Sequence, residues 1–230
     1  MKPLRVNSIV VGTLFILGTA FGVLAVSLEG SILNAPDYLA QMAANAGQIN
    51  AGAFLQFLMA MSCAGIGIAL YPVMKLHHEG QAIAVAGFRT IEGMIQVVGG
   101  VCTIGLLSVG QEFVRAGTAE AANLQALGTV IRAGSDWLSN GPMLLSWCIA
   151  ALIYYSVFYQ YKLVPRWVSA WGLIGIVLII VSSVLITLNI VHTIDPFQTF
   201  ASLPIAVQEM VFAVWLIAKG YSQPATTQQA

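Results

Sequence analysis

Six long apolar stretches dominate this sequence, and each is long enough to cross a lipid bilayer as a helix. About 20 helical residues span the hydrocarbon core. The stretches are Ser8–Leu28, Ala51–Met74, Ile83–Val109, Gly141–Tyr161, Trp167–Ile190 and Phe200–Ala218. Because every backbone polar group in lipid must be satisfied within its own segment, we expect these stretches to be helices. The sequence therefore predicts an all-α, polytopic membrane bundle of six transmembrane helices.

The composition supports this class. Of 230 residues, 58% are hydrophobic and only 8% are charged, where a soluble domain carries about 25%. Nine basic and nine acidic residues give a formal net charge of zero, which argues against nucleic-acid binding because that needs a basic cluster. We assign residues 1–221 to a single six-helix transmembrane domain and residues 222–230 to a polar disordered tail.

Basic residues concentrate on one side of the predicted membrane. That side holds Lys2, Arg5, Lys75, Lys162, Arg166 and Lys219. The other side holds two basic residues and six acidic ones, which are Arg115, Arg132, Glu29, Asp37, Glu112, Glu120, Asp136 and Asp195. Because basic loops stay in the cytoplasm, both termini are predicted to be cytoplasmic.

Two long outer loops each contain a candidate short helix. After Pro36 and Asp37, one helical face would carry Tyr38, Leu39, Met42, Ala46 and Ile49. Thr118 could cap a second helix, ending at Gly134, whose apolar side carries Leu124, Leu127 and Ile131. We interpret both as interfacial helices on the outer surface. Ordered loops with helical turns are the alternative.

Charged residues inside the apolar stretches are the most informative feature. The third stretch contains Arg89 and Glu92, the sixth contains Glu209, and we expect no other charged side chain to lie deep. At 100° per residue the third stretch has one polar face, made of Arg89, Glu92, Gly93, Gln96, Gly100 and Thr103. In the sixth, Gln208 neighbours Glu209, and Pro204 lies about one turn earlier, where it frees a backbone carbonyl.

These charged groups support a binding hypothesis and a structural alternative. One arginine and two glutamates leave a net negative charge, so one Glu should be protonated or a cation should bind. We therefore predict a ligand- or ion-binding centre formed by Arg89, Glu92, Gln96, Gln208 and Glu209. Alternatively, Arg89 pairs with Glu209 and clamps the third stretch to the sixth, with Glu92 neutral.

Other motifs add little chemistry. The sequence lacks H-E-x-x-H, G-x-S-x-G, Walker and Rossmann motifs, and no histidine pair in the spans could hold haem. We therefore predict no catalytic residue, metal or cofactor. We interpret the adjacent His77 and His78 as a solvated loop, with contact to a metal ion as the less favoured alternative. Gly18 and Gly22 form a G-x-x-x-G pattern, which is typical of close helix packing.

Three strings carry a resemblance to a known family. They are Phe88-Arg89-Thr-Ile-Glu92, Leu163-Val-Pro-Arg-Trp-Val-Ser-Ala-Trp-Gly172, and Leu203-Pro-Ile-Ala-Val-Gln-Glu209 followed by Trp215-Leu-Ile-Ala-Lys-Gly220. Together they resemble an uncharacterised bacterial integral-membrane family, the domain-of-unknown-function family 4386. The resemblance implies a multi-pass six-helix bundle in the bacterial cytoplasmic (inner) membrane. It assigns no catalytic residue, because the family has no established activity.

Three functional hypotheses follow. The first is a protein that binds or transports a small ligand, cation or proton at the Arg/Glu centre. The second is a non-catalytic accessory or sensory protein whose buried charges only lock the bundle. The third is a membrane enzyme acting on a lipid. The expected partners are the bilayer, a small molecule or ion, and a second copy of the chain, but not nucleic acid.

Overall fold

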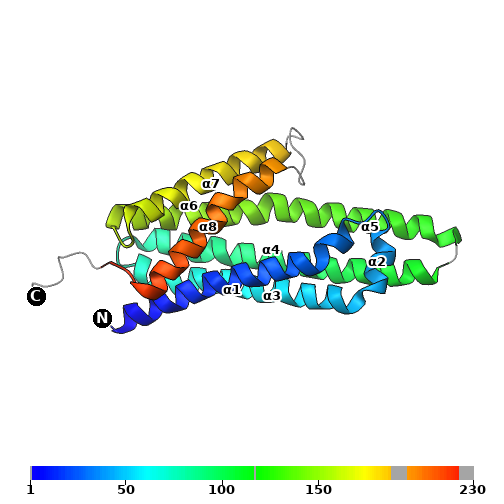
Figure 1. Ribbon diagram of the computed structural model, residues 1–230, viewed down its shortest axis with the longest axis horizontal. Coiled ribbons are helices and arrows are strands. Elements are labelled where there is room, and N and C mark those ends of the chain that lie inside the picture. Colours follow the sequence, from blue (N-terminus) through cyan, green and yellow to red (C-terminus); the bar gives the residue numbers. More distant parts are fainter. Residues whose placement is uncertain (1, 117, 188–195, 223–230) are drawn as a thin grey trace, which may run out of the picture.

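The computed structural model describes residues 2–116, 118–187 and 196–222, and these residues form helices without any strand. The predicted polar tail lies outside the described residues from residue 223 onward. The elements are α1 (Lys2–Leu33), α2 (Tyr38–Ala44), α3 (Ala46–Met74), α4 (Glu79–Arg115), α5 (Thr118–Leu138), the π-helix η1 (Ser139–Met143), α6 (Leu144–Tyr161), α7 (Arg166–Thr187) and α8 (Pro196–Ala218) (Figure 1).

Five helical segments of the described chain are long and apolar enough to cross a bilayer. They are Pro3–Leu33, Ala46–Met74, Glu79–Arg115, Glu120–Tyr161 and Arg166–Val184, and Leu203–Ala218 is a shorter apolar helix. Large apolar side chains such as Val26, Met94 and Val101 are mostly exposed. Such a surface needs an apolar surrounding, so the chain is a multi-pass membrane protein in a lipid bilayer.

The prediction that the helix from Thr118 ends at Gly134 is wrong. The helix begins at Thr118 but continues through Gly134 to Leu138, and η1 joins it to α6. A single helical glycine costs only about 1 kcal/mol, which tertiary packing can offset. Pro142 lies inside η1, where the wider π-helical turn accommodates a residue that would otherwise break the helix. The expected surface helix is therefore the first half of a long continuous helical segment.

Proline does not interrupt α8 either, because this helix continues through Pro204 without a break.

The other predicted interfacial helix, α2, packs against protein. Its expected apolar face is buried, but against α4 rather than on a lipid surface; the cluster consists of Ile32, Tyr38, Leu39, Met42, Ile49, Leu106, Leu107 and Val109. Arg132 of α5 donates to the Leu33 carbonyl and lies 5.3 Å from the centre of the Tyr38 ring. This second core closes the end of the molecule remote from the termini, which we call the distal end (Figure 1).

The first and last helices meet at the opposite end, which we call the terminal end. Arg5 donates to the carbonyls of Leu216 and Ala218 at 3.1 and 3.3 Å. The Tyr221 hydroxyl donates to the Asn7 side chain at 3.3 Å. Next to these contacts lies the main core, which includes Val11, Phe15, Tyr154, Tyr155, Phe158, Phe212 and Leu216. The terminal end is therefore tightly closed.

Candidate functional site

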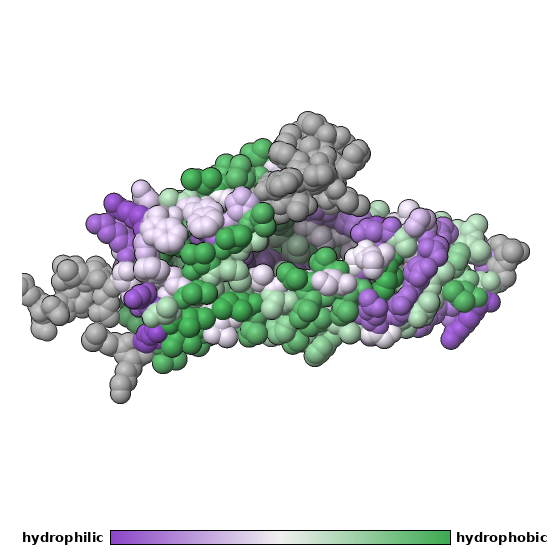
Figure 2. All heavy atoms as spheres, in the orientation of Figure 1, coloured by the Kyte–Doolittle hydropathy of each residue, from purple (hydrophilic) through white to green (hydrophobic). Residues whose placement is uncertain are grey.

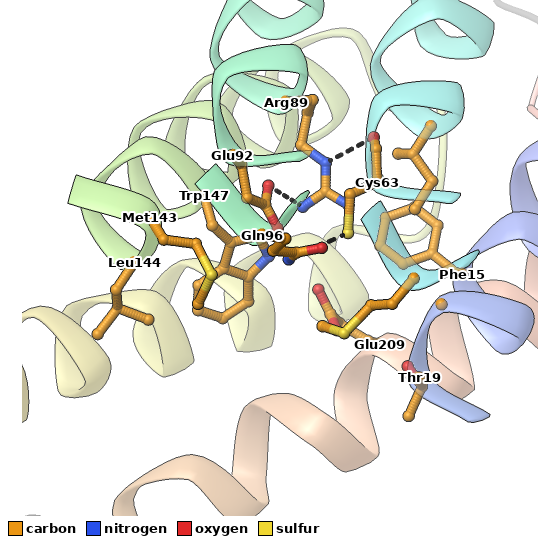
Figure 3. Close-up of a pocket in the computed structure, with 13 residues that line it drawn as sticks. Phe15, Thr19, Cys63, Arg89, Glu92, Gln96, Met143, Leu144, Trp147 and Glu209 are labelled. Atoms are coloured by element: carbon orange, nitrogen blue, oxygen red, sulfur yellow. Dashed lines mark hydrogen bonds and ion pairs between the residues drawn. The ribbon is translucent and has the colours of Figure 1, made fainter. Parts of the chain in front are cut away.

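The polar face of α4 is buried, as its spacing predicts. Arg89, Glu92 and Gln96 are 2%, 4% and 8% exposed. Arg89 Nη1 lies 2.8 Å from Glu92 Oε2, and Arg89 Nε donates to the Cys63 carbonyl of α3 at 3.3 Å. Gln96 Nε2 donates to Glu92 Oε1 at 3.4 Å. Figure 3 shows these groups converging from one side of α4. Arg89 is thus paired with Glu92 and hydrogen-bonded to the α3 backbone.

Glycines allow α3 to approach this face. A Cβ added at Gly93 would lie 2.8 Å from the Ala60 carbonyl oxygen, and one at Gly67 would lie 2.6 Å from Arg89 Cβ. Neither position leaves room for a side chain. The close approach brings the Cys63 carbonyl within reach of the guanidinium, so small residues on two helices create the polar contact.

These groups line a cavity of about 220 Å³. Five helices and η1 contribute to its wall, which consists of Phe15, Gly18, Thr19, Met59, Cys63, Ile66, Arg89, Glu92, Gln96, Met143, Leu144, Trp147 and Glu209. Figure 2 shows the surface hollowed between α1 and α8. In Figure 3 the Glu209 carboxylate lies across the cavity from the Arg89–Glu92 pair. The Trp147 indole is within hydrogen-bonding reach of Glu209.

The cavity exists because α8 leaves α1 partway along its length. A Cβ at Gly12 would lie 2.6 Å from the Ala213 carbonyl oxygen, and the rings of Phe15 and Phe212 are 5.2 Å apart. One turn before Ala213, toward the distal end, Glu209 lines the cavity together with Gly18 and Thr19 of α1. Beyond it, α8 packs on α7, where a Cβ at Gly175 would lie 3.0 Å from Ile205.

Four of the five predicted site residues therefore line one cavity: Arg89, Glu92, Gln96 and Glu209. The alternative in which Arg89 pairs with Glu209 is wrong, because the ion pair of Arg89 is with Glu92. Gln208 lies elsewhere. It is fully buried, accepts from the Tyr155 hydroxyl at 2.7 Å and donates to the Val168 carbonyl at 3.0 Å. Its role is to join α8 to α6 and α7.

Sequence reasoning missed one buried carboxylate. Glu29 was expected in an outer loop, but α1 extends to Leu33 and leaves Glu29 only 3% exposed. Its Oε2 accepts from Gln56 Nε2 of α3. The available signal was the spacing of Gly18, Gly22, Ala25 and Glu29, which places all four on one helical face. Gly18 and Gly22 pack on α3 as predicted, facing Ser62 and Met59.

The described residues contain no group of three His, Cys, Asp or Glu side chains that could hold a metal ion. The two loop histidines have local roles instead. His78 Nδ1 accepts from the Gln81 amide at 3.3 Å and caps α4. The His77 ring stacks on Tyr161 at 4.3 Å, and partial burial lowers the pKa of His77 below its usual 6.5.

Comparison with known proteins yields one family match. Residues 10–220 match the family described as domain of unknown function DUF4386. The match includes Glu29 and every residue that lines the cavity. No curated protein and no solved structure matches the chain.

Proposed function

We propose that this chain, which belongs to the DUF4386 family, binds a small organic cation in the cavity between α1, α4 and α8. The observation that carries the proposal is the charge balance of the cavity wall. Arg89 is already paired with Glu92 at 2.8 Å. No ion pair involves Glu209 within the described part of the chain, although its carboxylate faces the same space. A positively charged ligand would neutralise it.

The rest of the wall favours an organic cation over a metal ion. Apart from the α4 residues and Glu209, it is largely apolar and includes Phe15, Met59, Ile66, Leu144 and Trp147. Metal ions such as Ca²⁺ or Mg²⁺ need about six oxygen ligands, and this wall supplies few. An ammonium group with short alkyl substituents needs one carboxylate and gains from aromatic rings and soft thioethers.

The position of the cavity suggests a route for the ligand. The contacts of Gly12 with Ala213 and of Phe15 with Phe212 join α1 to α8, and toward the distal end the two helices diverge (Figure 1). Residues of both helices line the cavity. We propose access from the bilayer through this gap. We also propose that α8 is the sixth membrane span and that both termini lie in the cytoplasm of a bacterial cell. The excess of basic residues at the terminal end supports this orientation.

Ligand-dependent stability tests the proposal. The purified protein in mild detergent would be melted with tetramethylammonium, choline or ethylammonium, and with sodium at equal ionic strength. A ligand at 100 times its Kd stabilises by about 2.7 kcal/mol. We expect at least one organic cation to raise the Tm, and Glu209→Gln to abolish the shift. Glu112→Gln should keep it, because Glu112 is exposed, pairs with Arg115 and does not line the cavity.

One contact favours the accessory or sensory alternative. Arg89 Nε fastens α4 to the α3 backbone at Cys63, which is a structural role. Under that alternative no organic cation would raise the Tm of the native protein. A cation that stabilises the native protein and Glu209→Gln equally would also overturn the proposed site.

A further inference from the structure

Glu29 forms a second buried carboxyl site, separate from the cavity. It lies on the distal half of α1 and is 3% exposed. Among the described residues, only one of its oxygens has a hydrogen-bond partner: Oε2 accepts from Gln56 Nε2, while Oε1 is buried without one. An ionised carboxylate would have to forgo most of its hydration for a single neutral donor, which is strongly unfavourable.

No counterion faces this carboxyl from the neighbouring helices. On α3 it meets Gln56 and Gly52, neither of which is charged. Asp37, next to α2, accepts from Gln41, and Arg132 of α5 binds the Leu33 carbonyl and the Asn34 side chain. From α4, the uncharged Gly100 lies near the Gln56 side chain. In the described part of the chain no ion pair includes Glu29.

Glu29 Oε1 is buried and has no surface that a water molecule could touch, so water does not replace the missing partner. A Cβ added at Gly52 would lie 2.5 Å from Glu29 Cγ and 2.6 Å from its carboxyl carbon. The α3 backbone therefore presses directly on the side chain. A water molecule needs space for a probe of about 1.4 Å radius and at least two polar partners. A proton bound to Oε1 needs no such space, and it removes the charge that would otherwise be buried without a partner.

We propose that Glu29 is a proton-binding site, carrying its proton on Oε1 and accepting from Gln56 through Oε2. The neutral acid holds the distal half of α1 against α3. Binding and release of this proton would change the contact between α1 and α3 rather than the cation cavity. The site does not depend on the proposed cation binding, since Glu29 does not line the cavity.

Infrared spectroscopy of the protein in lipid vesicles at pH 7 tests this directly. A neutral carboxylic acid has a carbonyl stretching band that an ionised carboxylate lacks. We expect the spectrum of the native protein to lose one such band in Glu29→Gln. Glu112→Gln is the matched control and should lose none, because Glu112 is exposed and forms an ion pair with Arg115. An unchanged band in Glu29→Gln, or loss of carboxylate absorption instead, would overturn the proposal.

A second variant covers the case in which Glu29→Gln does not fold. Gln56→Met removes the donor to Oε2 and keeps the apolar bulk of the side chain. If Oε2 is the carbonyl oxygen of a neutral acid, one of the neutral-acid bands in the native spectrum should move to higher frequency in Gln56→Met. A spectrum of Gln56→Met with no shifted acid band would show that Gln56 does not contact a protonated Glu29.

Discussion

The molecule buries carboxylates in two different ways. Glu92, 4% exposed, lies 2.8 Å from the guanidinium of Arg89 and borders a cavity. Glu29, 3% exposed, has an amide donor and a glycine backbone against it, and no described residue forms an ion pair with it. Equal burial therefore does not imply equal chemistry. The first carboxylate can stay ionised, whereas the second is best accommodated as a neutral acid.

The two regions also depend on different helices. The Arg89–Glu92 pair lies within α4, and α3 adds only a carbonyl and the room that its small residues provide. The Glu29 site exists only where α1 meets α3. Substitutions that remove charge should therefore destabilise the Arg89–Glu92 region most, while substitutions that add side-chain volume should destabilise the Glu29 region most. Four variants test this contrast.

The largest expected effect is that of Arg89→Gln. It leaves Glu92 buried without a counterion and removes the donor to the Cys63 carbonyl. We expect a loss of about 3–5 kcal/mol in the free energy of unfolding, measured by dodecyl sulfate titration in mixed micelles. The double variant Arg89→Gln/Glu92→Gln should recover most of that loss. A double variant as unstable as the single one would show that the ion pair is not the source.

Gly52→Ala tests the packing at the second region. The new methyl group would collide with the Glu29 side chain, so we expect a loss of about 1–3 kcal/mol by the same titration. The matched control is Gly47→Ala in the same helix, where a Cβ meets nothing within 4 Å. There the lower backbone freedom of alanine should stabilise by about 0.4–1 kcal/mol. Equal effects at both positions would mean that the space beside Glu29 is not limiting.

The contrast between the regions also explains what could be predicted from the sequence. The α4 face was predictable because Arg89, Glu92 and Gln96 follow one helical period in a single segment. Glu29 was missed because the apolar run ends at Leu28 while α1 continues for about another turn. Only its spacing from Gly18, Gly22 and Ala25 indicated a buried position. That extra turn is stabilised by contacts with Gln56 and Arg132, which are remote in sequence.

Breaker residues misled the prediction at one further point. Gly134 suggested the end of a surface helix separate from the fourth apolar stretch, yet α5, η1 and α6 are continuous. The π-helical turn at Pro142 also brings Met143, Leu144 and Trp147 to the cavity wall. Hydropathy cannot indicate such a turn, because it arises from how the helix packs. The third and sixth stretches share a cavity, although α8 packs on α1 and α7.

Gln208→Leu tests whether the Gln208 amide stabilises the fold without taking part in cation binding. It removes the acceptor of the Tyr155 hydroxyl and the donor to Val168. We expect a loss of about 1 kcal/mol in the free energy of unfolding. The Tm shift produced by an organic cation should be unchanged, since Gln208 does not line the cavity. If Gln208→Leu folds but its Tm no longer shifts with an organic cation, Gln208 is part of the binding site.

The smallest expected effect comes from Glu29→Gln, and it is the most direct test of the contrast. Glutamine matches the shape of a neutral glutamic acid and keeps an oxygen that accepts from Gln56. We expect the free energy of unfolding at pH 7 to change by less than the roughly 0.6 kcal/mol of an average interhelical hydrogen bond in a membrane. The same substitution at Glu92 removes the partner of a buried arginine and should cost about 3 kcal/mol or more. If Glu29→Gln and Glu92→Gln lose equal free energies of unfolding, Glu29 is ionised in the native protein. Each substitution would then remove a negative charge that stabilises the fold.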